Sequence, residues 1–165
     1  MRTDENEDGS RNVSDRHLML VGRITSNWSL FETMIDMAIW HLADVEDNSG
    51  ACLTAQIAGS ARKLDALIAL FHLHYPAESL SLRKLQQAAE KSRDLAEKRN
   101  RVVHDHWRLM DGKPSRLEIT ARKRLKFGAV FVSEDDLFKL ADEVMHHANE
   151  FWKLLRPYLQ YPDDE

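Results

Sequence analysis

Residues 133–157 read SEDDLFKLADEVMHHANEFWKLLRP and decide the fold class, because they form the clearest amphipathic helix pattern in the chain. Ser133 followed by three acidic residues is typical of a helix start, since a serine caps free backbone N–H groups and carboxylates oppose the helix dipole. Pro157 marks the end of the helix. Between them apolar residues recur at helical spacing: Leu137, Leu140, Val144, Met145, Ala148, Phe151, Trp152 and Leu155.

Three further amphipathic helices are expected before this one. The first begins at Ser14, which we interpret as its N-cap. The second follows a turn at residues 47–50 (DNSG) and ends at Pro76, and the third runs from about Glu78 past Val103. The apolar positions of the first helix are Leu18, Val21, Ile24, Trp28, Phe31, Ile35, Ile39 and Leu42; those of the second are Leu53, Ile57, Leu64, Leu67, Ile68 and Phe71.

The region between the third and fourth long helices has a different pattern. In residues 107–132, alternation and β-branched residues replace the helical period, and the DGKP sequence favours a turn. The sequence therefore predicts a mainly α protein, an up-down four-helix bundle with a short β-hairpin inserted between the third and fourth long helices.

Length and composition bound the organisation of the chain. The 165 residues, 43% of them hydrophobic, suit one domain, which we place at 14–157, with a disordered N-terminal tail at 1–13 and a C-terminal tail at 158–165. No apolar run is long enough to cross a membrane, and the acidic N-terminus differs from a secretory signal. The lone Cys52 cannot form an internal disulfide; we expect it to be a small buried residue, and a catalytic thiol is the alternative. We therefore expect a cytoplasmic protein without membrane partners.

The first helix carries a second set of apolar residues beside its main stripe. This set comprises Leu20, Leu30, Met34 and Met37. Two interpretations remain open at this point: a surface that binds a partner chain, or one broad face within the bundle.

Charge is distributed unevenly along the chain. The net charge is −4, yet Arg83 to Lys126 contains 14 Lys or Arg against 6 Asp or Glu. Such a basic block in an acidic protein is typical of a surface that binds a polyanion such as nucleic acid. The alternative is a solvated helix face followed by a charged hairpin.

The third helix ends in the sequence EKRNRVVHDHW, residues 97–107. Arg99 falls within the apolar stripe of this helix and therefore needs an anion or acceptor, for which Glu32 of the first helix is a candidate; an exposed Glu32 is the alternative. Asn100 and His104 are four residues apart and share one helix face.

Arg99, Asn100 and His104 spell R-N-x-x-x-H near the end of a late helix, and this pattern resembles the HEPN superfamily (higher eukaryotes and prokaryotes nucleotide-binding domain). In that superfamily an R-x(4-6)-H motif marks metal-independent endoribonucleases. The resemblance covers residues 14–157 and implies a HEPN-like helical bundle that forms a homodimer, with the two motifs facing each other. It allows a cognate antitoxin or regulatory protein as a further partner, and it implies neither a metal nor a cofactor.

RNA cleavage without metal requires a base, an acid and a cation for the developing phosphorane charge. One motif supplies one histidine, so His104 from each of two chains would serve as base and acid, while Arg99 stabilises the phosphate and Asn100 orients it. His106 is a candidate second phosphate contact, and Trp107 is expected in the core. Candidate RNA-binding residues are Arg101, Arg108, Arg122, Lys123, Arg124 and Lys126.

Two classes of function follow from these patterns. The first is a metal-independent endoribonuclease in stress response or defence. The second is a non-catalytic dimeric module that binds RNA or protein through the same surface. The paired histidines at 72 and 74, 104 and 106, and 146 and 147 give only a weak metal signal, because no Cys cluster or H-E-x-x-H motif accompanies them.

Overall fold

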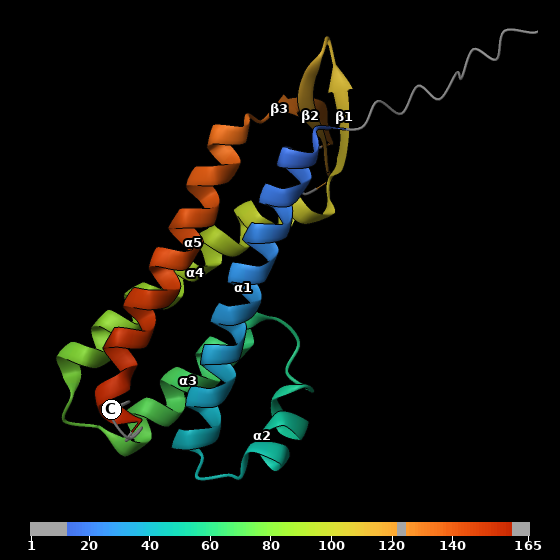
Figure 1. Cartoon of the computed structure of the whole chain (residues 1–165). Coiled ribbons are helices and arrows are strands. Elements are labelled where there is room, and N and C mark those ends of the chain that lie inside the picture. The colour runs from blue at the N-terminus through green and yellow to red at the C-terminus, as the bar shows by residue number, and fades with distance from the viewer. Residues whose placement is uncertain (1–12, 122–124, 160–165) are drawn as a thin grey trace, which may run out of the picture.

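The computed structural model describes residues 13–121 and 125–159, and this part of the chain is mainly helical (Figure 1), which confirms the predicted class. Its elements follow in the order α1 (Asp15–Leu42), α2 (Asp47–Thr54), α3 (Ser60–His74), α4 (Ser79–His104), β1 (His106–Met110), β2 (Lys113–Thr120), β3 (Lys126–Phe131), α5 (Glu134–Leu155) and the 3-10 turn η1 (Arg156–Tyr158). The predicted tails at 1–13 and 158–165 lie mostly outside the described residues.

Both predicted helix starts are confirmed. The Ser14 side chain accepts a hydrogen bond from the His17 backbone N–H at 3.1 Å and caps α1. Ser133 forms a capping box with Asp136 at the start of α5: its hydroxyl oxygen accepts from the Asp136 N–H, and the Asp136 carboxylate accepts from the Ser133 N–H. These local bonds satisfy N–H groups that have no partner within the helix, and they fix where both helices begin.

The predicted second helix is wrong in its boundaries, because the chain forms two helices there. The DNSG segment belongs to α2 rather than to a turn, and the preceding turn contains Asp44, which takes a left-handed conformation at φ 52°. A second interruption precedes α3 at Gly59, whose φ is 80°. Glycine adopts this conformation without steric cost, so it ends the helical path that the apolar spacing suggests.

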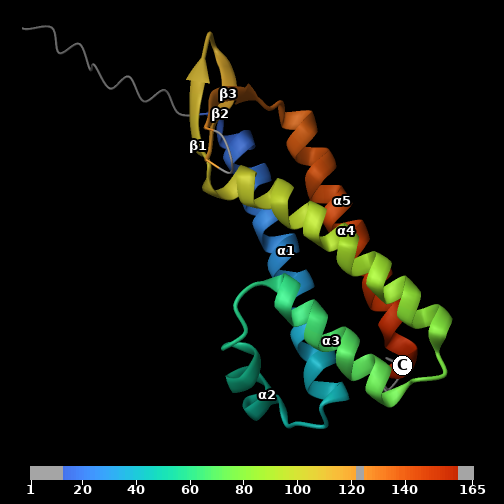
Figure 2. The same ribbon diagram turned by 180° about the vertical axis from the view of Figure 1, so that it is seen from behind.

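The up-down four-helix bundle is also corrected, because α1 and α5 run in parallel (Figure 1). Ser14 donates to the Glu134 carboxylate at 2.7 Å near the start of both helices, and further along Arg23 pairs with Asp142 at 2.7 Å. Figure 2 shows α3 and α4 on the other side, where α4 returns toward the sheet. Because of the added helix α2, the chain reverses direction once more than predicted. The first and last helices therefore run in the same direction.

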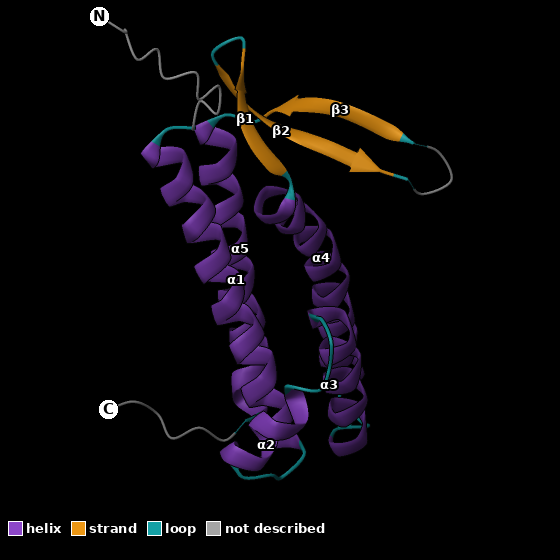
Figure 3. Cartoon of the chain, turned by 90° about the vertical axis from the view of Figure 1, so that its right-hand side faces the viewer, coloured by secondary structure: helices purple, strands orange, loops and turns teal. Residues whose placement is uncertain are grey.

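The predicted hairpin is part of a three-stranded antiparallel sheet in the order β1-β2-β3, placed between α4 and α5. Met110 pairs with Lys113, so Asp111 and Gly112 form a two-residue turn, and both have positive φ (50° and 70°), as a type I′ turn requires. Figure 3 shows the sheet at one end of the helices, with β2 and β3 projecting beyond the end of α4.

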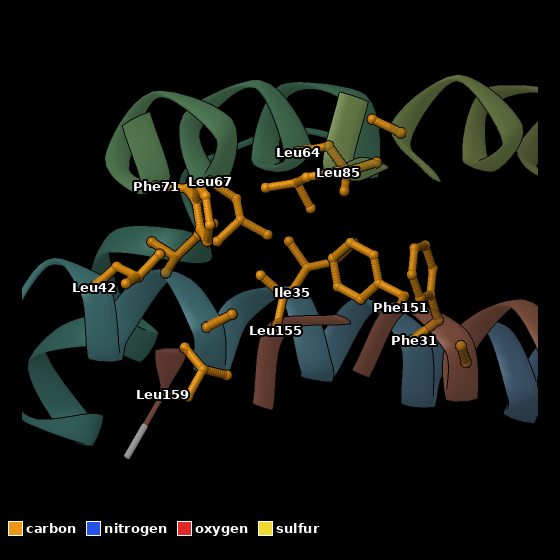
Figure 4. Close-up of a cluster of buried hydrophobic side chains, with 14 of the residues drawn as sticks. Phe31, Ile35, Leu42, Leu64, Leu67, Phe71, Leu85, Phe151, Leu155 and Leu159 are labelled. Carbon is orange, nitrogen blue, oxygen red and sulfur yellow. The ribbon is translucent and has the colours of Figure 1, made fainter. Parts of the chain in front are cut away.

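The main core lies between α1, α3, α4 and α5 (Figure 4). Phe31 and Phe151 meet edge to face with ring centroids 5.1 Å apart, an arrangement that aromatic quadrupoles favour. A second cluster near the sheet contains Leu20, Val102 and Leu137, with Trp107 packed against it. Trp107 also donates from Nε1 to the Val102 carbonyl at 2.7 Å, which anchors β1 to α4. Its side chain, predicted in the core, is half-buried at the edge of this cluster.

Cys52 is exposed on α2, so its predicted burial is wrong; α2 covers the core mainly with Gly50 and Thr54. Within residues 13–121 and 125–159, none of the helices is both long and apolar enough to traverse a bilayer.

Candidate functional site

The R-N-x-x-x-H motif occupies the last two turns of α4. Asn100 and His104 are exposed and lie one helical turn apart on one face. His104 is the last residue of the helix, and Asp105 after it is already extended, with φ −72° and ψ 145°. The two polar side chains therefore stand at the open end of the helix, where the chain turns into β1.

Arg99 is directed differently from the other two motif residues. Its side chain is half-buried, and its Nη1 donates to the Asn100 side-chain oxygen at 3.0 Å. Its Nε is buried, and no residue of the described chain accepts a hydrogen bond from it. An unpaired buried donor costs about 1–3 kcal/mol, so the surrounding packing must offset this cost. Arg99 was predicted to lie within the apolar stripe of this helix, and its half-buried side chain agrees with that position.

A groove with a volume of about 760 Å³ lies beside the motif, between α4, the start of α3 and the end of β2. Asn100 and His104 line it, whereas Arg99 does not. Its charged lining residues are of both signs: Arg93, Arg101 and Lys126, and Glu97, Asp105 and Glu118. The groove is therefore not uniformly cationic.

The carboxylate of Asp105 holds the junction between α4 and the sheet. It accepts from Arg116 of β2 at 2.6 Å and lies 3.6 Å from Arg101, while Arg116 also lies 3.7 Å from Glu118. These side chains are half-buried, so their attraction is less screened than that of surface pairs. The sequence pattern did not reveal this network, because Arg116 reaches Asp105 only after β2 has paired with β1.

The expected ion pair between Glu32 and Arg99 is not formed in the described part of the chain. Glu32 is half-buried on α1, and the ion pair found on the same helix one turn later joins Asp36 to Lys63 of α3 at 2.7 Å. The side chains of this pair are 19% and 14% exposed, which makes it a partly desolvated link between α1 and α3.

The predicted RNA-binding residues fall into three groups. Arg101 is partly neutralised by Asp105, and Lys126 is exposed at the edge of the groove. Arg108 and His106 are exposed on β1, away from the groove lining. Arg122, Lys123 and Arg124 lie outside the described residues.

The burial of two histidines was not predicted from the sequence, where His147 appeared only in a weak metal signal. The His147 ring nitrogen Nε2 lies 2.8 Å from the Ser92 hydroxyl, and burial, together with the nearby Lys91 charge, lowers the pKa of His147 to about 4. Burial also lowers the pKa of His17, against an opposing effect of Glu134, and both of its ring nitrogens are without a hydrogen-bond partner in the described residues. Each occupies an apolar stripe of its helix, which is the only sequence signal of its burial.

Groups of three or more His, Cys, Asp or Glu side chains close enough to hold a metal ion do not occur among the residues that the structure describes. Comparison with protein-family models, with curated proteins and with solved structures gives no significant match to this chain.

Proposed function

We propose that this chain is a HEPN-like, metal-independent endoribonuclease whose composite active site forms between two copies of the chain. One observation carries the proposal: Asn100 and His104 are exposed one turn apart at the end of α4, beside an open groove, and the Arg99 guanidinium is held against Asn100. These are the residue types that RNA cleavage through the 2′-hydroxyl requires.

In this reaction one imidazole takes the proton of the 2′-hydroxyl, and the oxygen attacks the adjacent phosphorus. The bond to the 5′-oxygen then breaks, and a protonated imidazole gives that oxygen its proton. The products are a 2′,3′-cyclic phosphate and a free 5′-hydroxyl. Arg99 stabilises the charge on the phosphorane oxygens, and Asn100 positions both the guanidinium and the phosphate.

A homodimer supplies the second imidazole, because the motif of each chain contains one histidine. A two-fold axis near the end of α4 would bring His104 of both chains to one phosphate. His106, exposed two residues further on, is a candidate phosphate contact at the same end of the helix. A cytoplasmic role in stress response or defence, with a cognate antitoxin or regulatory protein as partner, belongs to the same proposal.

The test uses labelled RNA in the presence of EDTA. Wild-type protein should cleave it and leave a 2′,3′-cyclic phosphate, and His104→Ala should lower the rate by about 10²- to 10⁴-fold, as loss of an acid or base does. His74→Ala is a matched control, because His74 is likewise the exposed last residue of a helix, here α3, and its substitution should leave the rate unchanged.

Mixed dimers test the shared site. A His104→Ala chain paired with a wild-type chain retains only one imidazole at each phosphate, so its rate should fall far below half of the wild-type rate. A heterodimer that keeps half or more of that rate would show that each subunit acts alone.

A second candidate function is a non-catalytic RNA- or protein-binding module. One observation favours it: Arg99 does not line the groove, so the cation that the cleavage reaction needs is directed elsewhere. This reading predicts RNA binding that weakens with salt and no cleavage by the wild-type chain.

A further inference from the structure

The outward-facing side of the sheet combines exposed aromatic rings with cationic side chains. Strand pairing places Leu117 beside both His106 and Ala129, Ser115 beside Arg108 and Phe131, and Ile119 beside Phe127. Paired residues point to the same side of a sheet, so alternate residues of the three strands form this surface, which we call the outer face. Its members are His106, Arg108, Met110, Lys113, Ser115, Leu117, Ile119, Phe127, Ala129 and Phe131.

The opposite side of the sheet faces the helices. Trp107 packs against the second core cluster and against His17, with ring centroids 4.3 Å apart. Arg116 reaches Asp105 at the end of α4, and Glu118 and Lys126 line the groove beside the motif. These contacts account for the inner residues of the sheet and leave the outer face without a partner element within the described chain.

The outer face exposes several large apolar side chains, whereas Ser115 near its centre is buried. Phe127 is 69% exposed, Phe131 53% and Ile119 54%. The two rings are four residues apart on β3, about 13 Å along the strand. Both rings are accessible on a strand whose other edge is unpaired in the described sheet.

The charge of the outer face is of one sign. Arg108 and Lys113 are exposed, and neither forms an ion pair within the described residues; Lys113 lies 5.9 Å from the centroid of the Phe131 ring. The one carboxylate of the three strands, Glu118, is on the inner side, and Asp111 is confined to the β1–β2 turn. A ligand for this surface should therefore be anionic and carry flat apolar groups.

We propose that the outer face binds single-stranded nucleic acid, with bases stacked on Phe127 and Phe131 and the backbone phosphates near Arg108 and Lys113. Aromatic rings accept any base, and cations beside them neutralise the phosphates. Duplex RNA is a poor fit, because its bases are already stacked. A second copy of the chain fits less well, since two-fold contact of this face with itself would oppose cation to cation without a carboxylate between them.

This inference specifies the substrate class of the proposed ribonuclease, and in that respect it rests on the proposed function. It places a single-stranded segment of RNA on the sheet next to the motif: the outer face begins at His106, two residues after His104. The outer face thus adjoins the end of α4 at His106, whereas the groove beside the motif lies on the inner side of the sheet.

Binding is measured by fluorescence anisotropy with three probes of equal length: single-stranded RNA, single-stranded DNA and duplex RNA. The DNA lacks the 2′-hydroxyl, so it reports binding even if the chain cleaves RNA. Phe127→Leu combined with Phe131→Leu keeps apolar side chains but removes the π faces, and it should weaken binding of both single strands roughly tenfold or more. Duplex RNA should bind more weakly than either single strand.

Phe138→Ala is the matched control. Phe138 is 45% exposed on α5 and lies under the Arg23 guanidinium at 5.1 Å, so it is an exposed ring beside a cation but outside the sheet. Its loss should leave binding unchanged. Thermal unfolding of all variants checks that each is folded, and Arg108→Gln with Lys113→Gln should reduce the salt dependence of binding.

Unchanged binding of the DNA probe by the double Leu variant would overturn the inference. So would light scattering that shows a dimer converted to a monomer by Phe127→Glu with unaltered binding of nucleic acid, because the outer face would then join two chains. Absence of RNA cleavage with ring-dependent binding of DNA would instead refute the proposed ribonuclease and leave the outer face as a nucleic-acid site.

Discussion

His147 lies in the interior of the protein between α4 and α5, where its ring is only 4% exposed. The Ser92 hydroxyl, which donates to the Ala88 carbonyl, accepts readily from the Nε2–H of a neutral imidazole. Burial disfavours the charged ring, and Lys91 adds a like charge nearby, so the pKa falls to about 4. His147 is therefore a structural residue that is neutral near pH 7.

Acidification should destabilise the fold through His147. In the unfolded chain this histidine takes up a proton near its ordinary pKa of 6.5, whereas the folded chain does so only near 4. Stability is thus full above pH 6.5 and is lost as the pH falls toward 4, on the order of 2 kcal/mol for this group. Urea unfolding at several pH values measures the loss.

The variant His147→Gln should show a flatter pH dependence over the same range, because glutamine does not titrate. Some slope should remain, since burial also lowers the pKa of His17. The exposed neighbour His146 gives the control His146→Ala, which should keep the wild-type slope. Identical slopes for His147→Gln and the wild type would contradict this account.

Among the elements, α2 depends on one small residue. Gly50 is buried against Trp40 of α1, and a Cβ at this position would lie 2.4 Å from the indole ring. Trp40 also donates from Nε1 to the Thr54 hydroxyl at 3.0 Å, so α2 is fixed to α1 at two successive turns.

Gly50→Ala should therefore lower the free energy of unfolding by about 1–3 kcal/mol, since either Trp40 or α2 must move. Gly22→Ala is the matched control: Gly22 is exposed in α1 with open space around it, and alanine should raise stability by roughly 0.5–1 kcal/mol. Urea unfolding followed by circular dichroism measures both changes. Equal effects of the two substitutions would show that α2 is not packed on Trp40.

The helices were predictable from sequence where a local signal fixed them. Ser14 and Ser133 marked two helix starts, because capping depends on residues within one turn. The break at Gly59 was not predictable, since a single glycine within apolar spacing is compatible with a continuous helix. Which side of the sheet faces outward depends on contacts between residues distant in sequence, such as Trp107 on His17.

The candidate site was likewise predictable only in part. The position of Asn100 and His104 on one face followed from their spacing. The apolar stripe also indicated that Arg99 turns inward. The lack of an acceptor for its Nε among the described residues and the neutralisation of Arg101 did not follow from the sequence, because they depend on the packing of the bundle and on Arg116 reaching Asp105.

At the scale of the whole molecule, α1 retains an exposed apolar stripe. Met19 is 62% exposed and Leu30 42%, and eleven residues of separation place them on one side of the helix. Of the set proposed from the sequence as a partner surface, Leu30 is exposed, Met34 and Met37 are half-buried and Leu20 is buried. Met19, which was not in that set, lies on the same side of α1 as Leu30 and would belong to such a surface.

Light scattering at micromolar concentration should give twice the chain mass of 19.1 kDa. Met19→Glu combined with Leu30→Glu should give a monomer and abolish cleavage, because a charge in an apolar interface is costly. Leu73→Glu, at a 71% exposed position of α3, should remain dimeric. A wild-type chain that is monomeric would exclude the shared active site.

The short junction between α4 and β1 limits where residues can be inserted into the chain or deleted from it. A single residue, Asp105, separates the helix from the strand, and alternation then turns Trp107 inward and its neighbours His106 and Arg108 outward. Inserting or deleting one residue here would exchange the two faces of β1, exposing the indole and burying two basic side chains. The number of residues from His104 to Trp107 is therefore fixed. Insertions and deletions should be tolerated only in the turns farther along the sheet.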